Sequence, residues 1–308
     1  MDNPDSFSKD QFRGCLLGLA CGDALCASYE GGILERALWR LIGKTGGQLR
    51  FTDDTQMALD IIHSINHCGE LDQDHLAGQF ARSYRWSRGY GPGSAKLLKS
   101  IKRGVDWRTA NNRHFKNGSY GNGAAMRAPV LALFFQSEAE LLAAAEQAAM
   151  ITHAHPLGIE GAQLLAMGAL MAMQQQSPVV MAEIMLKLVK QDALQQKLLR
   201  LQQQIEAQLV HNPKSMVQQY GNGMSAPQSC VTALATALQF LPRPYTEMTA
   251  FIGQMGGDAD TIAAMAGAIW GAYHGYQAMQ VDAVNTIEAG QLMIELADQV
   301  FINRHAVI

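Results

Sequence analysis

Charged residues are scarce in this sequence, and neither sign of charge dominates. Only 17% of the 308 residues are charged, and the formal net charge is −3. A protein that mainly binds a nucleic-acid backbone needs a basic surface, because neutralising phosphates supplies a large share of that binding. No basic patch stands out along the chain, so the composition gives no support for nucleic acid as the main partner.

Cysteine is also scarce, and its spacing is not that of a disulfide framework or a zinc site. The five cysteines are odd in number, form no C-x-x-C pair and lie among Ala, Gly and other apolar residues. This pattern argues against disulfides or a zinc site and predicts small buried apolar side chains. The residues are Cys15, Cys21, Cys26, Cys68 and Cys230.

No segment has the pattern of a secretory signal. The first ten residues, MDNPDSFSKD, are polar and acidic, whereas such a signal begins basic and continues apolar. Residues 261–279 are nearly uncharged and long enough to raise the question of a membrane span. They follow two aspartates and contain His274 and several glycines, so we expect a buried core helix there, no membrane contact and a cytoplasmic protein.

Strand-like alternation is nearly absent, and no proline- or serine-rich linker divides the chain. Apolar residues instead recur every three or four positions in segments rich in Ala, Leu, Met and Gln, which is typical of helices. The sequence therefore predicts an all-α fold, a single multi-helix domain over residues 1–308. The predicted helical segments are QFRGCLLGLACGDAL, TQMALDIIHSINH, AAMRAPVLALFF, EAELLAAAEQAAM, GIEGAQLLAMGALMAM, VVMAEIMLKLV and ALQQKLLRLQQQIEAQLV.

Glycines collect in short loops between these segments. Glycine serves where the chain needs a positive φ or where backbone must approach another group closely. Each loop taken alone is explained as a helix connection, but each also carries polar residues, and together they predict the walls of one cleft. The loops are CGDALCASYEGG, SRGYGPGSA, NGSYGNGAAMRAP, QYGNGMSAP and GQMGGDADTIA.

Two acidic clusters lie where a loop enters an apolar helix. A helix start is stabilised by one capping residue and one negative charge, so capping explains either cluster alone but leaves the adjacent carboxylates unexplained. Carboxylate and hydroxyl oxygens without His or Cys favour hard cations, and the matched pair predicts two Mg²⁺ or Mn²⁺ ions. The clusters are Thr52, Asp53 and Asp54, and Asp258, Asp260 and Thr261.

Five blocks of the sequence resemble the signature blocks of the ADP-ribosylglycohydrolase family, which includes the dinitrogenase reductase-activating glycohydrolase. They follow the family's order and span roughly residues 14–275. The resemblance implies an all-α single domain whose binuclear Mg²⁺ or Mn²⁺ site cleaves the N- or O-glycosidic bond between ADP-ribose and its acceptor. The blocks are GDALCASYE, FTDDTQMAL, YGNGAAMRAPVLAL, THAHPLGIEGA and GGDADTIAAMAGAIWGA.

The resemblance also implies roles for single residues. The two acidic clusters become the metal ligands, Asp53 and Asp258 become essential to catalysis, and Glu30 matches the family's carboxylate near the metals and the scissile bond. Whether Glu30 acts as acid or base stays open. The implied substrate-binding residues are Asn117, Gly118, Ser119, Tyr120, Gly121, Asn122 and Gly123 around the diphosphate and ribose, His153 against the substrate, and Gly223 and Met224 near the adenine.

Simple chemistry agrees with several of these roles. Successive backbone N–H groups can hold a diphosphate where side chains are missing, as in GSYGNG. Tyr120 offers an aromatic surface, and His153 can donate to a phosphate or ribose oxygen, or else be a buried histidine near a helix start. His155 precedes Pro156, so we expect it to be structural.

The expected partners are ADP-ribose and ADP-ribosylated protein, but the acceptor side chain is not assigned. SRGYGPGSA resembles the branch that acts on serine-linked ADP-ribose, O-acetyl-ADP-ribose and poly(ADP-ribose), whereas THAHP resembles the arginine-acting bacterial branch. Two other classes stay open. A catalytically silent binding or structural member would have lost a metal ligand, and none is lost; a metal-dependent phosphohydrolase would be expected to carry an H-D dipeptide, and none occurs.

Overall fold

Two helices with small residues on their contact faces form the centre of the fold. In α1 (Lys9–Cys26) a glycine recurs at every fourth position from Gly14 to Gly22, which places these glycines on one face. That face lies against α14 (Ala259–His274). A Cβ atom added at Gly18 would lie 2.2 Å from the carbonyl oxygen of Gly267. The two backbones are therefore in direct contact, and only glycine permits it.

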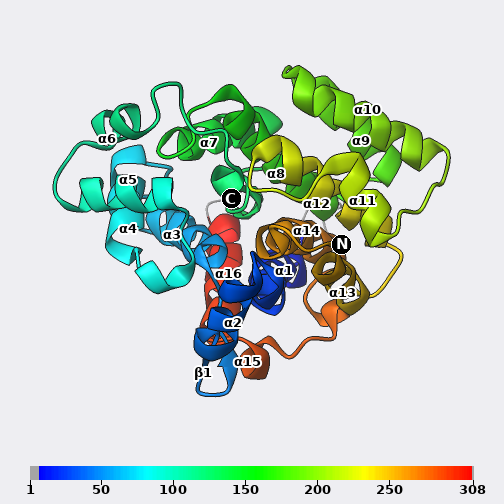
Figure 1. The fold of residues 1–308 in the computed structure, drawn as a ribbon, viewed down its shortest axis with the longest axis horizontal. Coiled ribbons are helices and arrows are strands. Elements are labelled where there is room, and N and C mark those ends of the chain that lie inside the picture. Colours follow the sequence, from blue (N-terminus) through cyan, green and yellow to red (C-terminus); the bar gives the residue numbers. More distant parts are fainter. Residues whose placement is uncertain (1–6, 307–308) are drawn as a thin grey trace.

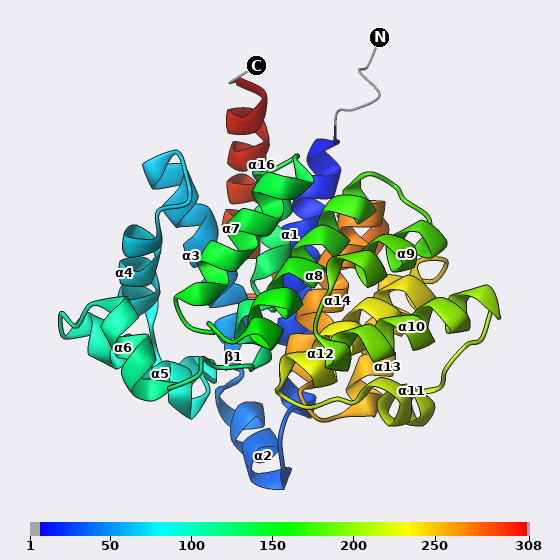
Figure 2. The same cartoon turned by 90° about the horizontal axis from the view of Figure 1, so that it is seen from above.

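The other helices surround this pair. Figures 1 and 2 show α3 to α6 gathered on one side of it, and α9 to α11 on the other. Helices α8, α12 and α13 pack on α14, while α16 packs on α1. Their bounds are α2 Ile33–Ile42, α3 Asp53–Cys68, α4 Gln73–Ser83, α5 Pro92–Lys102, α6 Trp107–His114, α7 Glu138–Met150, α8 Pro156–Met173, α9 Pro178–Leu188, α10 Asp192–Glu206, α11 Pro213–Tyr220, α12 Ala226–Phe240, α13 Tyr245–Met255, α15 Ala283–Thr286 and α16 Gly290–Ala306.

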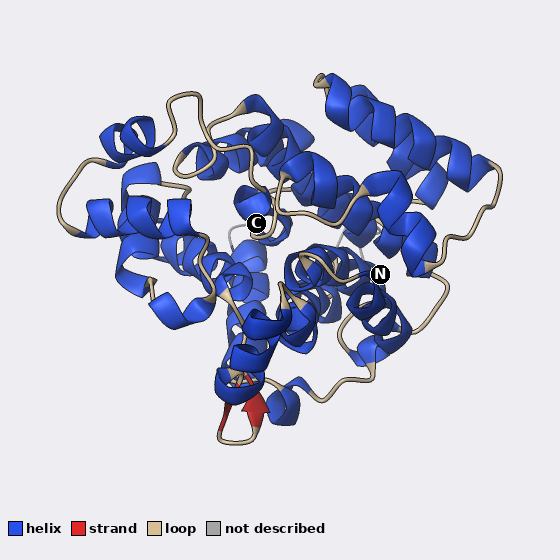
Figure 3. Cartoon of the chain, viewed as in Figure 1, coloured by secondary structure: helices blue, strands red, loops and turns tan. Residues whose placement is uncertain are grey.

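The computed structural model describes residues 7–306. Helices dominate this range (Figure 3), and the strands β1 (Lys44–Thr45) and β2 (Gln48–Leu49) form one short antiparallel hairpin. The predicted all-α, single-domain fold is confirmed. The first six and last two residues of the predicted domain lie outside the described range, so its outer bounds stay a prediction.

One predicted helix has a different form. The segment AAMRAPVLALFF is largely 3₁₀-helical, with η3 (Asn122–Ala124) ending at its first residue and η4 (Ala128–Leu133) within it. Pro129 lies in the first turn of η4 and has no backbone N–H to continue an α-helical ladder. The prediction of an α-helix was therefore wrong here. The irregular backbone instead leads from the glycine loop into the core.

The core contains the apolar run that raised the question of a membrane span and most of the cysteines. From Thr261 to Ala272, α14 is buried inside the protein, as predicted for this part of residues 261–279, but the helix ends at His274, and Gln277 and Ala278 are exposed. The five cysteines are free thiols, four of them buried and Cys68 half-buried. By length and apolar composition alone, one helix among the described residues, α8, is able to span a membrane, and 78% of that window is buried inside the protein.

Candidate active site

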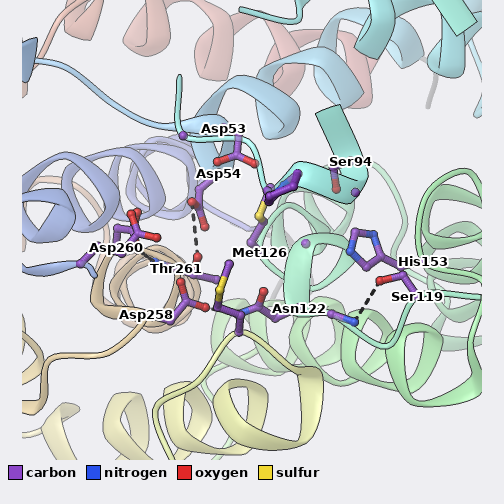
Figure 4. A pocket seen from close by; sticks show the side chains of 18 of the residues that line it. Asp53, Asp54, Ser94, Ser119, Asn122, Met126, His153, Asp258, Asp260 and Thr261 are labelled. Carbon is purple, nitrogen blue, oxygen red and sulfur yellow. Dashed lines mark hydrogen bonds between the residues drawn. The ribbon is translucent and has the colours of Figure 1, made fainter. Parts of the chain in front are cut away.

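The glycine loops meet at one pocket, as predicted from their composition. Each of the five contributes to its lining, so segments far apart in the sequence surround a common space. Figure 4 shows the aspartates on one side of this space and His153 and Ser119 on the other. The lining residues are Glu30, Asp53, Asp54, Gly89, Gly91, Pro92, Gly93, Ser94, Phe115, Ser119, Gly121, Asn122, Gly123, Met126, His153, Met224, Asp258, Asp260 and Thr261.

The start of α3 presents Asp54 to this pocket. Thr52 caps the helix as predicted, and its hydroxyl donates to Oδ2 of Asp54 over 2.8 Å. The second oxygen, Oδ1, is fully buried and has no hydrogen-bond partner among the described residues. A buried carboxylate oxygen without a donor is costly unless a cation or a proton satisfies it. Oδ1 of Asp54 thus fits a metal ligand.

The start of α14 is held by a turn that requires glycine. Gly256 and Gly257 have φ values of 61° and 71°, in the left-handed region that favours glycine. A Cβ atom at Gly257 would lie 2.2 Å from the carbonyl oxygen of Asn222, and the next N–H, from Asp258, donates to that same oxygen over 2.9 Å. This turn fixes the direction in which Asp258 enters the pocket.

The two predicted acidic clusters come together in space. The hydroxyl of Thr261 lies 3.5 Å from Oδ2 of Asp54, which links the start of α14 to the start of α3 (Figure 4). Two sets of three carboxylates can be distinguished, and within each set one oxygen of every residue lies within 4.8 Å of the others. Asp260 belongs to both sets. The sets are Asp23, Asp54 and Asp260, and Glu30, Asp258 and Asp260. Each set could hold a cation, and Asp260 could be a ligand in either one.

Charge repulsion in this cluster is strong. Burial, followed by the charges of Asp23 and its other neighbours, raises the pKa of Asp54 well above its usual range. Burial and then the charge of Glu30 do the same to the pKa of Asp260. Asp53 belongs to neither set, although burial and the charges of Asp23 and Glu30 also raise its pKa. Bound cations would relieve this repulsion and favour the ionised carboxylates.

Asp23 is part of the site but was not predicted from the sequence. Its carboxylate accepts hydrogen bonds from the backbone N–H of Thr52 and Thr55, at 3.0 and 3.1 Å, and from the Thr55 hydroxyl at 2.6 Å. Burial raises its pKa to about 6. The available signal was an aspartate in the apolar second half of its helix, which has to find polar partners in the folded protein.

The loop predicted to hold the diphosphate only partly faces the pocket. Ser119, Gly121, Asn122 and Gly123 line it, whereas Asn117, Gly118 and Tyr120 are not among the lining residues. The lining part is fixed against the opposite loop, because the N–H of Asn122 donates to the carbonyl of Met224 over 3.0 Å.

The remaining residues of the loop have other surroundings. Gly118 has a φ of 76°, and a Cβ atom there would lie 2.3 Å from the backbone nitrogen of His155, so this glycine permits a close crossing of two chain segments. Tyr120 is 56% exposed and packs edge-on against the His155 ring. The aromatic surface expected from Tyr120 is thus present beside the loop, outside the pocket lining.

The side chain of Asn122 faces the acidic cluster. Its Nδ2 donates to Oδ2 of Asp258 and, over 2.9 Å, to the Ser229 hydroxyl. Burial raises the pKa of Asp258, and the hydrogen bonds from Asn122 and Thr261 oppose that shift. Asn122 therefore orients Asp258, a contact that could not be predicted from the sequence.

Of the predicted histidine and the two residues predicted near the adenine, some line the pocket and one does not. His153 lines the pocket, and His155 instead caps α8, where its Nδ1 accepts from the N–H of Leu157 over 3.1 Å, as expected for a structural residue. Met224 lines the pocket and is 59% exposed. Gly223 is not a lining residue; a Cβ atom there would lie 2.2 Å from Oε1 of Gln228.

This geometry agrees with comparisons to known proteins. The sequence model of the ADP-ribosylglycohydrolase family matches residues 4–307. The chain belongs to the ADP-ribosylglycohydrolase family. ADP-ribosylhydrolase ARH3 of Xenopus tropicalis is 32% identical over 306 residues, covering 86% of this chain and 87% of its own length. The human ADP-ribosylhydrolase ARH3 is 31% identical over 317 residues, covering 87% and 86%.

Two further matches extend this result. The ADP-ribosyl-[dinitrogen reductase] glycohydrolase of Rhodospirillum rubrum is 34% identical over 158 residues, which cover 48% of this chain and 53% of that protein. A solved structure described as an ADP-ribosylglycohydrolase-related protein complex covers 96% of this chain and 98% of its own, with a TM-score of 0.72 and 25% identity. The helical architecture of the family therefore extends over nearly the whole chain.

Proposed function

We propose that this protein is a metal-dependent hydrolase that cleaves the glycosidic bond between ADP-ribose and an acceptor, and that it removes ADP-ribose from modified protein. The observation that carries the proposal is the pair of carboxylate sets sharing Asp260, directly beside a glycine-lined wall in one pocket. A family relationship over nearly the whole length supports it, since relatives bear the names of ADP-ribosylhydrolases.

The acidic side of the pocket fits two Mg²⁺ or Mn²⁺ ions. Its donors are carboxylate and hydroxyl oxygens, which such hard cations prefer, and the buried Oδ1 of Asp54 has no protein donor among the described residues. When bound, these ions would hold ribose hydroxyls and lower the pKa of a bound water. The residues proposed to hold them are Thr52, Asp53, Asp54, Asp258, Asp260 and Thr261; of these, Asp53 lines the pocket but belongs to neither carboxylate set.

The chain supplies the other requirements of the reaction. Glu30 belongs to the set with Asp258 and Asp260 and lines the pocket, so its carboxylate can orient and deprotonate a water or assist the leaving group. Cleavage at the anomeric carbon develops positive charge, which the surrounding carboxylates stabilise. The backbone from Ser119 to Gly123 binds the diphosphate on the opposite wall.

Identifying the released nucleotide tests this proposal. The protein is incubated with Mg²⁺ or Mn²⁺ and with arginine-linked or serine-linked ADP-ribosylated protein in parallel, and Asp258→Asn serves as the inactive control. We expect free ADP-ribose from at least one linkage. AMP would support a phosphohydrolase instead, and no product from either linkage would support a silent member of the family.

A further inference from the structure

A buried arginine lies behind the glycine-lined wall of the pocket. Arg127 is 1% exposed, and its guanidinium lies 4.6 Å from the centre of the Phe80 ring. It donates from Nη1 to the carbonyl of Gly123 over 2.8 Å, and from Nη2 to the carbonyl of Ala148 over 3.0 Å. An arginine so deeply buried is expensive to desolvate, so its contacts require an explanation.

A third contact of Arg127 leads to the pocket histidine. Nη2 also donates to Oγ1 of Thr152 over 2.8 Å, and the same hydroxyl lies 2.7 Å from Nδ1 of His153. Arg127, Thr152 and His153 therefore form one continuous chain of hydrogen bonds. Thr152 is 1% exposed, so water does not compete for its hydroxyl.

The chemistry of the first group sets the direction of this chain. A guanidinium can only donate, so the Thr152 oxygen accepts from Arg127 and its own proton is available for Nδ1 of His153. The opposite direction, with Nδ1 donating, would leave the buried hydroxyl proton without an acceptor among the described residues. Nδ1 therefore accepts, and the proton of the neutral ring is on Nε2.

Nε2 lies beside the backbone of the glycine loop. Cβ atoms added at Gly121 and Gly123 would lie 3.1 and 3.0 Å from it. His153 lines the pocket on the side of Ser119, opposite the aspartates (Figure 4). An N–H group at Nε2 thus joins the backbone N–H groups of this wall as a donor.

We propose that Arg127 and Thr152 are positioning residues that hold His153 as a neutral Nε2–H donor for an anionic diphosphate in the pocket. The identity of that ligand, the diphosphate of ADP-ribose, rests on the proposed function. The assignment of the proton rests only on the hydrogen-bond chain.

The electrostatics of the ring agree with this role. Burial, and then the positive charge of Arg127, lower the pKa of His153 to about 3. The ring is consequently neutral between pH 5 and 8, where a histidine can donate from only one nitrogen. Fixing the tautomer therefore decides whether His153 offers the wall a donor or an acceptor.

The position of the proton is measurable in the full chain without ligand. Long-range ¹H–¹⁵N spectra of the ¹⁵N-labelled protein at pH 7 distinguish the two tautomers and the imidazolium, and His153→Gln identifies the signals by their loss. We expect a neutral ring protonated at Nε2 in the wild type and in Thr152→Ser, and a mixture of tautomers in Thr152→Val. A wild-type ring protonated at Nδ1, or doubly protonated, would overturn the proposal.

Calorimetric titration with free ADP-ribose tests the consequence for binding. Thr152→Val should bind more weakly in proportion to the Nε2–H fraction that it loses, about twofold for an equal mixture of tautomers, whereas Thr152→Ser should match the wild type because the hydroxyl is kept. Equal affinity in Thr152→Val and wild type would contradict the positioning role. If the wild type does not bind ADP-ribose, the proposed function fails, while the spectra still decide the tautomer. If Thr152→Val does not fold, the wild-type spectrum and Thr152→Ser keep the test decisive.

Discussion

At the scale of single residues, the candidate site is a concentration of buried carboxylates whose charge the surrounding protein does not neutralise. Asp54 shows this most clearly, since one of its oxygens accepts from Thr52 and the other has no donor among the described residues. Such a group lowers stability in the absence of a cation and binds a cation strongly when one is present. The same residue can therefore oppose folding and support function.

Replacing Asp54 by Asn separates these two effects. Without metal, Asp54→Asn should have a Tm equal to or higher than the wild type, because burial, and then the neighbouring charges, disfavour an ionised carboxylate at this position and raise the pKa of Asp54. With Mg²⁺ or Mn²⁺, the wild type should gain more thermal stability than the variant. Differential scanning calorimetry with and without metal measures both. Glu206→Gln, an exposed change on α10, is the matched control, and an equal metal response in all three proteins would contradict the metal assignment.

Glu30 is the residue whose replacement should affect chemistry more than binding. Its carboxylate lies within 4.8 Å of oxygens of Asp258 and Asp260 in the lining of the pocket. Glu30→Gln keeps the size and removes the charge and basicity. We expect kcat to fall by a factor of about 10² to 10⁴, the range for a lost acid–base group, while ADP-ribose affinity stays within several-fold. Turnover assays with calorimetric titration check both, and unchanged turnover would remove Glu30 from the mechanism.

At the scale of elements, the backbone contact of α1 and α14 determines how closely the metal-site residues approach. Asp23 lies near the end of α1, and Asp260 lies at the start of α14, where the two helices run past each other. The two backbones are in contact at two pairs of glycines, Gly14 with Gly271 and Gly18 with Gly267. A wider spacing would move the carboxylates apart, so packing in the core and geometry in the pocket are coupled.

Gly18→Ala tests this coupling. The added methyl group would lie 2.2 Å from the carbonyl oxygen of Gly267, which cannot rotate away, so the helices must separate. We expect a loss of about 2–4 kcal/mol in the free energy of unfolding, and weaker metal binding in the protein that still folds. Gly78→Ala in α4 is the control, because its methyl group meets only the flexible Arg82 side chain, at 3.1 Å. Chemical denaturation should find the control neutral or more stable, since alanine favours helix.

Helices and contiguous clusters could be predicted from the sequence more accurately than contacts between residues far apart in the chain. Helices could be predicted because apolar spacing is a local property, and the acidic clusters because each is contiguous in the chain. The contacts of Asp23, Arg127 and Asn122 could not, because each side chain acts through residues distant in sequence. The helix expected across Pro129 failed for a local reason, the missing N–H, which the apolar pattern obscured.

At the scale of the whole molecule, the glycine loops form one pocket because the helices they connect share one core. Apolar residues from α1 to α16 belong to a single buried cluster. Polar residues inside such a core affect the stability of the whole chain, since unfolding exposes them together. Asp60 is one of these, on α3 but outside the pocket lining, and 1% exposed.

Asp60 should make the stability of the protein depend on pH. Burial raises the pKa of Asp60 to about 7, while hydrogen bonds from Ser83 and Gln79 on α4 oppose the shift. The unfolded chain releases this proton near pH 4, whereas the folded protein keeps it until about pH 7. The stabilising contribution of the protonated form is therefore complete below about pH 4 and is lost as the pH rises to 7.

Asp60→Asn isolates this contribution, because an amide cannot ionise. The amide can keep the contacts: its oxygen can accept from Nε2 of Gln79, 3.2 Å away in the wild type, and its nitrogen can donate to the Ser83 hydroxyl, which in turn has the Phe80 carbonyl within 3.2 Å. Relative to wild type, the variant should gain up to about 2–4 kcal/mol between pH 4 and pH 8. Urea unfolding of the wild type and the variant across this range measures the difference. Both proteins are kept free of metal, so the metal-site carboxylates contribute equally to the two curves. A difference that does not change with pH would mean that Asp60 is ionised in the folded protein throughout this range.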